Sequence, residues 1–113
     1  MKKIIFISAF LLLGSFALKA QNNTSKTDTI KVWGNCDMCE TTIEKAAKKV
    51  KGVTKANWDV DKKILIVTYK VSETNNQEIQ KAVANAGYDT EAMTGDDNAY
   101  AKLHKCCQYE RKK

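Results

Sequence analysis

The chain has 113 residues, of which 43% are hydrophobic and 28% are charged. That length allows one small domain and leaves no room for a second one. The net charge of +6 falls to +3 without the first twenty residues, because three of the 19 basic residues lie there and none of the 13 acidic ones. The remaining excess is concentrated in the last twelve residues, which predicts a solvated basic end and no nucleic-acid partner.

The first twenty residues have the pattern of a secretory signal peptide. A basic start, Lys2 and Lys3, precedes an apolar run over 4–18, and small Ala20 is followed by polar residues. We predict cleavage after Ala20, so the protein is exported to the periplasm and leaves the membrane. The alternative is an uncleaved anchor, although the run is shorter than the roughly 20 residues of a spanning helix.

After a polar linker over 21–26, the first half of the domain predicts a strand, a helix and a second strand. Residues 27–33 alternate between polar and apolar, as a half-buried strand does. Asp37 and Glu40 have the spacing of a capping box, which predicts a helix beginning near Met38. Its apolar stripe follows helical spacing through Ile43, Ala46, Ala47 and Val50.

Residues 53–59 predict the strand that ends this first half, and a polar turn joins it to a strand over 64–70 that is rich in β-branched residues. The second half, residues 64–93, repeats the order of strand, helix and strand. Asn75 with a glutamate three positions later predicts the start of another helix, which ends at Gly87. Residues 88–93 predict a short fourth strand.

The order βαββαβ predicts an α+β domain over residues 27–94. Two helices with one apolar stripe each must bury those stripes against a common surface. A four-stranded antiparallel sheet with both helices on one face provides that surface. Residues 95–113 form a separate basic extension that contains two of the four cysteines.

The other two cysteines, Cys36 and Cys39, lie where the first strand ends and the first helix begins. A helix N-terminus carries unpaired N–H groups and partial positive charge, and both favour thiolate over thiol. Two thiolates held close together suit Cu(I) and Hg(II), or Zn(II) if further ligands are present.

Three other interpretations of this pair remain open at this point. A dithiol redox site would use Cys36 as the nucleophile, although the element order and the absence of proline differ from a thioredoxin-like protein. A structural zinc site would combine the pair with His104 and a tail cysteine. A structural disulfide would close a very small loop and constrain little unfolded chain.

The stretches WGNCDMCETTIEKA, KGV, ILIVTYK and ANAGYDTE occur in an order that resembles the heavy-metal-associated (HMA) domain family. That family includes copper chaperones, modules of copper-exporting ATPases and periplasmic mercury-binding proteins. The resemblance covers about 28–93. It implies a ferredoxin-like fold and soft-metal binding by Cys36 and Cys39.

The resemblance also implies roles for residues around the loop. The family usually has methionine where this chain has Gly34, two positions before Cys36, and Met38 is the residue expected to compensate. Asn35 completes the loop. Tyr88 matches the family position that follows the second helix and lies near the metal.

The tail cysteines, Cys106 and Cys107, lie outside the family domain. Adjacent cysteines rarely form a disulfide with each other because the ring is strained. We expect the tail to fold back and supply one or two further ligands from this pair, with His104 as a weaker candidate. A closed site of this kind would retain or sense metal, whereas an open site of two thiolates would pass it on.

Together these features predict an exported metal-binding protein and no catalytic activity. Cu(I) is the first choice of metal, and Hg(II) and Zn(II) are the alternatives. The expected partner is a protein that donates or accepts metal, such as a copper transporter. The protein is expected to be a monomer or a metal-bridged dimer.

Overall fold

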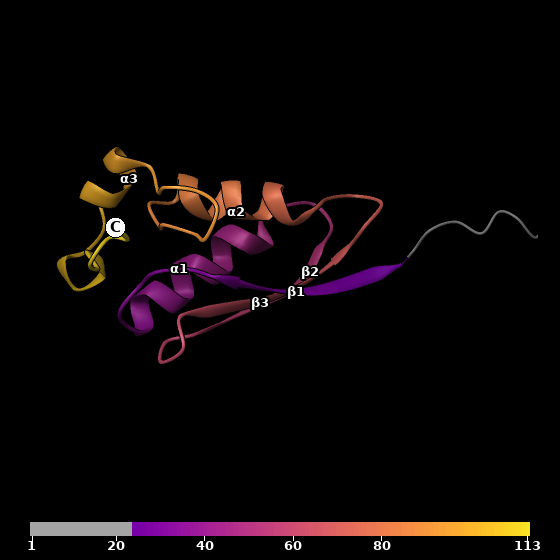
Figure 1. Cartoon of the computed structure of the whole chain (residues 1–113), viewed down its shortest axis with the longest axis horizontal. Coiled ribbons are helices and arrows are strands. Elements are labelled where there is room, and N and C mark those ends of the chain that lie inside the picture. The colour runs from indigo at the N-terminus through magenta and orange to yellow at the C-terminus, as the bar shows by residue number, and fades with distance from the viewer. Residues whose placement is uncertain (1–23) are drawn as a thin grey trace, which may run out of the picture.

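The computed structural model describes residues 24–113, so the predicted signal peptide and its cleavage site lie outside the described residues. The elements are β1 (Ser25–Lys31), α1 (Asp37–Lys48), β2 (Val53–Asp59), β3 (Ile64–Lys70), α2 (Asn76–Asn85), α3 (Asp97–Ala101) and the 3-10 turn η2 (Lys105–Cys107). Figure 1 shows α1 and α2 on one face of the sheet, with α3 and the C-terminus at one end of the domain. Among residues 24–113, no helix is long and apolar enough to cross a bilayer.

The sheet is antiparallel with the strand order β1-β3-β2. The central strand β3 has the predicted bounds, and its alternation buries Leu65, Val67 and Tyr69. Strand β2 also has its predicted bounds, whereas β1 begins at Ser25, inside the predicted linker. The β-branched and aromatic residues of β3 therefore form the centre of the core, as their pattern indicated.

The prediction of a four-stranded sheet is wrong for the described residues, which form three strands. The segment after α2 forms only an isolated antiparallel bridge, between Val32 and Thr90. The chain turns immediately afterwards, with the Thr90 N–H donating to the Met93 carbonyl at 2.8 Å. The Gln80 side-chain oxygen then accepts hydrogen bonds from the Thr90 hydroxyl at 2.6 Å and the Ala92 N–H at 3.0 Å. The Gln80 side chain thus satisfies the Ala92 N–H within this turn.

The two helices differ in how they begin. Asn75 caps α2 as predicted, because its side chain accepts a hydrogen bond from the Glu78 N–H at 2.9 Å. The predicted cap of α1 by Asp37 is wrong. Cys36 is the N-cap residue, in extended conformation and without a side-chain cap bond, and Asp37 is already helical. The sulfur of Cys36 is therefore left available for other contacts.

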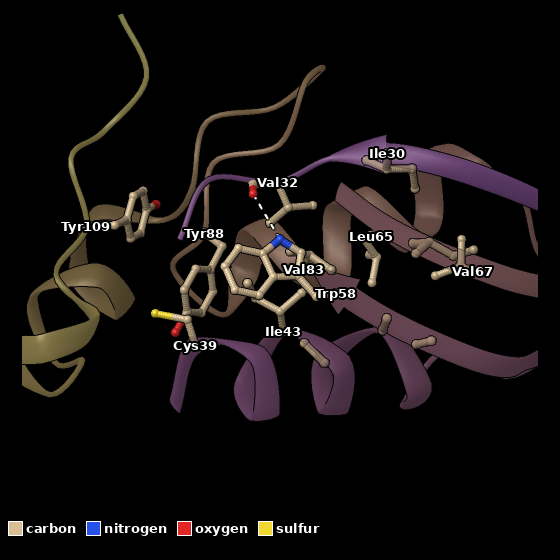
Figure 2. Packing of buried hydrophobic residues seen from close by; sticks show 14 of the residues in the cluster. Ile30, Val32, Cys39, Ile43, Trp58, Leu65, Val67, Val83, Tyr88 and Tyr109 are labelled. Atoms are coloured by element: carbon tan, nitrogen blue, oxygen red, sulfur yellow. Dashed lines mark hydrogen bonds between the residues drawn. The ribbon is translucent and has the colours of Figure 1, made fainter. Parts of the chain in front are cut away.

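Trp58 fills the core where the sheet meets the cysteine-containing loop of residues 33–39. It is 1% exposed, and its indole N–H donates to the Val32 carbonyl at 3.0 Å (Figure 2). Ile43 of α1 packs in the same cluster. The loop therefore rests on a large buried aromatic ring, which restricts how far the cysteines can move.

Candidate metal centre

The loop cysteines lie at the N-terminus of α1, where their sequence position placed them. Cys36 is half-buried, Cys39 in the first helical turn is fully buried, and their sulfur atoms are 3.6 Å apart. None of the four cysteines forms a disulfide. We call Cys36 and Cys39 the loop pair, and Cys106 and Cys107 the tail pair.

Asn35 holds the buried member of the loop pair. Its side-chain oxygen accepts a hydrogen bond from the Cys39 thiol at 3.2 Å, and its backbone N–H approaches the same sulfur at 3.5 Å. The Cys39 thiol is thus satisfied within the loop, although it is fully buried.

The environment of Cys36 favours its thiolate. Burial acts to raise the pKa of Cys36, but hydrogen bonding from the Cys39 backbone and from the Cys107, Cys106 and Cys39 thiols outweighs burial and lowers the pKa to about 7. The position at a helix N-terminus acts in the same direction. A thiol with this pKa is partly ionised near neutral pH and ready to bind a soft metal.

Gly34 is required by the close approach of Trp58. A Cβ atom at this position would lie 2.9 Å from two carbons of the Trp58 ring and 3.3 Å from Cδ1 of Ile43. The indole therefore occupies the space that a side chain at position 34 would need. Met38 does not compensate for the family's methionine by packing inward, because it is 45% exposed and its sulfur lies 3.4 Å from that of Cys106.

Replacing Gly34 with methionine, the usual family residue, is expected to destabilise this protein. The new side chain would overpack the Trp58 ring, which typically costs about 1–3 kcal/mol. Urea unfolding of the two proteins measures the difference. The double variant Gly34→Met/Trp58→Leu should recover part of the loss, because the smaller side chain vacates the same space. An unchanged midpoint for Gly34→Met alone would contradict this packing.

The tail folds back and brings its cysteines to the loop. The Cys36 sulfur lies 3.6 Å from that of Cys106 and 3.5 Å from that of Cys107, and these three sulfurs lie within 4.8 Å of one another. Cys106 is exposed and Cys107 is 2% exposed. His104, the weaker candidate, is exposed and lies outside this group.

Tyr88 lies beside the buried thiols, at the position that the family pattern indicated. The side chain is fully buried, and its hydroxyl has no hydrogen-bond partner within the described residues. Figure 2 shows the ring extending from the core toward Cys39. Burial, followed by the neighbouring Cys39 and Cys107 thiols, raises the pKa of Tyr88, so the hydroxyl is a donor at physiological pH.

The tail is anchored by an aromatic residue that the sequence did not single out. Tyr109 is 2% exposed and stacks on Tyr88, with ring centroids 5.5 Å apart. Its hydroxyl accepts from the Asp89 N–H at 2.8 Å and donates to the Gly87 carbonyl at 2.7 Å.

Gly87 has a φ of +104°, and a Cβ there would lie 2.8 Å from the backbone nitrogen of Tyr100. Glycine therefore allows the tail to pass closely.

An ion pair between buried Asp89 and half-buried Arg111 forms the second anchor of the tail. Both carboxylate oxygens of Asp89 accept from Arg111, at 2.9 Å and 3.0 Å, and they also accept from the Gly95 and Lys112 N–H groups. Lys112 donates its ammonium group to the carbonyls of Thr90 and Met93. The prediction of a solvated basic end is therefore wrong for Arg111 and Lys112, whose charged groups are engaged in the fold.

Acid is expected to weaken this anchor. Burial acts to raise the pKa of Asp89, but hydrogen bonds from Arg111, Gly95 and Lys112 outweigh it and hold the pKa below its usual value. The anchor's contribution to stability is complete above the ordinary aspartate pKa of about 3.9 and is lost as pH falls through the lower folded-state pKa. The unfolding free energies of the wild type and Asp89→Asn, measured from neutral pH downward, should therefore converge only below about pH 4. A constant difference at all pH values would contradict this role.

Sequence reasoning missed Asp89, Tyr109 and Arg111 because their roles depend on contacts between distant parts of the chain. One signal was available in the composition of the tail. A solvated end is poor in apolar residues, whereas this tail contains a cysteine pair, two tyrosines and a leucine: Tyr100, Leu103 and Tyr109. The same residues keep the tail pair beside the loop pair.

Comparison with known proteins agrees with this geometry. The heavy-metal-associated domain family matches residues 35–89. A mercuric transport protein periplasmic component of Shewanella putrefaciens is 37% identical over 89 residues, which cover 78% of this chain and 93% of that protein. The relative of the same name from Salmonella typhi is 38% identical over 65 residues, which cover 57% of this chain and 71% of that protein.

Solved structures show the same fold. The crystal structure of oxidized MerP from Ralstonia metallidurans CH34 matches with a TM-score of 0.58 and 35% identity, covering 60% of this chain and 96% of that chain. The CopZ metallochaperone matches with a TM-score of 0.56 and 26% identity, covering 57% of this chain and 98% of that chain. The predicted resemblance is confirmed, and this chain belongs to the heavy-metal-associated domain family.

Proposed function

We propose that this protein is an exported carrier of a soft metal ion, which it binds through Cys36 and Cys39 and passes on by exchange of thiolate ligands, without catalytic turnover. The observation that carries the proposal is the loop pair itself. Two sulfur atoms lie 3.6 Å apart at a helix N-terminus, and the pKa of Cys36 is lowered to about 7. Soft thiolates select Cu(I) and related ions over hard cations such as Mg²⁺.

Among soft metals, Hg(II) becomes the first candidate and Cu(I), the choice from the sequence, the second. The relatives named for mercuric transport support Hg(II), because the first of them is 37% identical and 93% of its length is covered. The solved structure of the putative copper-ion-binding protein from Bacillus anthracis str. Ames supports Cu(I) at 26% identity. Both ions use the same thiolate chemistry.

The partner we propose is a metal-donating or metal-accepting protein, a transporter for example, with an acidic docking surface. A hollow of about 530 Å³ adjoins the loop at Trp33, Gly34 and Asn35. Its remaining lining is mostly basic: Lys63, Arg111, Lys112 and Lys113, with the single acid Glu110. An acidic surface approaching the metal would be attracted by this rim, and the association would weaken as salt is added.

Anaerobic titration of the reduced mature chain, residues 21–113, tests the proposed function. This fragment contains every described element. One Hg(II) or one Cu(I) per chain is expected, retained in an excess of Zn(II). Displacement by zinc would support a structural zinc site instead. Reduction of insulin at the rate of a disulfide exchanger, without stable metal binding, would support a dithiol redox protein.

A further inference from the structure

We propose that the tail completes the metal site: Cys36, Cys106 and Cys107 hold the metal as three thiolates, and Cys39 stays outside this set. The inference rests on the proposed function and extends it. Cys36 is then shared between two ligand sets, the loop pair and the three-thiolate set. The protein would receive and release metal through an open site and retain it in a closed one.

The sulfur positions suit three ligands around one ion. A metal–thiolate bond of about 2.3 Å separates two sulfurs by about 4.0 Å in a trigonal site and about 4.6 Å in a linear one. Cys36 lies 3.6 Å and 3.5 Å from the two sulfurs of the tail pair, and all three lie within 4.8 Å of one another. Small outward movements would therefore admit the ion. Cys39 does not belong to this group and is hydrogen-bonded to Asn35.

The tail holds its cysteines in place through contacts that involve no metal. Tyr109 is buried against Tyr88, and the ion pair between Asp89 and Arg111 fixes the chain four residues after Cys107. The turn η2 itself contacts α1. Ligands ordered in advance lose little conformational entropy when the metal binds, and this raises affinity.

The hydroxyl of Tyr88 gives an independent indication that a thiolate belongs here. It is fully buried and has no partner within the described residues, an arrangement that is costly for a polar group. The buried Cys107 thiol is one of its neighbours. Once Cys107 becomes a metal-bound thiolate, it provides the acceptor that Tyr88 lacks.

The three proposed ligands differ in solvent exposure, which indicates how metal enters and leaves. Cys106 is exposed, Cys36 is half-buried and Cys107 is buried. The sulfur of Met38 lies 3.4 Å from that of Cys106. An incoming thiolate from an acceptor protein would reach the metal beside Cys106. Its bond to the metal forms as the bond from Cys106 breaks, and Cys106 takes up a proton while the acceptor thiol has lost one. The metal keeps its oxidation state.

X-ray absorption of the mature chain loaded with one equivalent of Hg(II) tests this proposal. We expect three sulfur ligands in the wild type and in Cys39→Ser, and two in Cys106→Ser/Cys107→Ser, with a shorter mean metal–sulfur distance. Competition with a small dithiol should show about a hundredfold weaker binding by the double variant, because it loses one ligand. Lys105→Ser, an exposed neighbour, is the matched control and should resemble the wild type.

Two sulfurs in the wild type, with equal affinity in the double variant, would overturn the proposal and leave the loop pair as the site. Loss of binding in Cys39→Ser would do the same. No binding by the wild type would instead overturn the proposed function. If circular dichroism shows that the double variant is unfolded, Cys106→Ser decides, because this exposed side chain is not part of the core. It should also lower the sulfur count to two.

Discussion

Replacing Cys36 with serine is expected to lower the affinity for Hg(II) or Cu(I) by at least about a hundredfold, more than any other single cysteine substitution. Structural zinc sites with four ligands bind with about 10–16 kcal/mol, so each ligand accounts for about 3 kcal/mol, or roughly a hundredfold in affinity. Cys36 lies within 3.6 Å of all three other sulfurs. Without it, neither ligand set remains intact.

Competition between the protein and a small dithiol for one equivalent of metal measures this loss. Thr41→Ala, an exposed substitution one turn along α1, is the control for effects of mutating this helix. Far-ultraviolet circular dichroism should be unchanged in both variants, because Cys36 makes no cap hydrogen bond. Equal affinity of Cys36→Ser and wild type would mean that the metal binds elsewhere.

Replacing Tyr109 with alanine is expected to cost about 3–5 kcal/mol of unfolding free energy, as large-to-small aromatic substitutions in cores do. The ring is 2% exposed and packs both on Tyr88 and edge-on against Tyr100. Small domains have only about 5–15 kcal/mol in total, so this loss is a large fraction. The variant should also bind metal more weakly, because the tail pair is no longer held beside the loop.

Two further substitutions separate the contributions to this effect. Tyr109→Phe keeps the ring but leaves the Asp89 N–H and the Gly87 carbonyl without their partner, so about 1–3 kcal/mol is expected. Glu110→Ala changes an exposed neighbour and should leave the urea midpoint unchanged. If Tyr109→Ala unfolds at the wild-type urea concentration, the tail is not part of the folded core.

The helices, two of the strands and the loop pair could be predicted because their signals are local. The stripe of Ile43, Ala46 and Ala47 is buried as its spacing indicated, and Asn75 caps α2 as its spacing to Glu78 indicated. Strand β3 was evident from its β-branched residues and has the predicted bounds. In each case the pattern and the structure involve residues a few positions apart.

Features that depend on distant contacts could not be predicted in this way. The fourth strand ends after a single bridge because the chain turns between Thr90 and Met93, where Gln80, from the preceding helix, accepts from the Thr90 hydroxyl and the Ala92 N–H. Gly34 looked like a departure from the family, but the ring of Trp58 fills the space from another strand. The fixed course of the tail depends on Asp89, which meets Arg111 from 22 residues away.

We propose that one chain binds one soft metal ion with its own thiolates. Native mass spectrometry of the reduced mature chain, with one equivalent of Hg(II) and excess glutathione under anaerobic conditions, tests it most directly. We expect a monomer that carries one mercury ion, because the loop pair and the tail pair lie together in the same molecule. A chain that loses its metal to glutathione, or one ion bridging two chains, would show that these thiolates do not form the site.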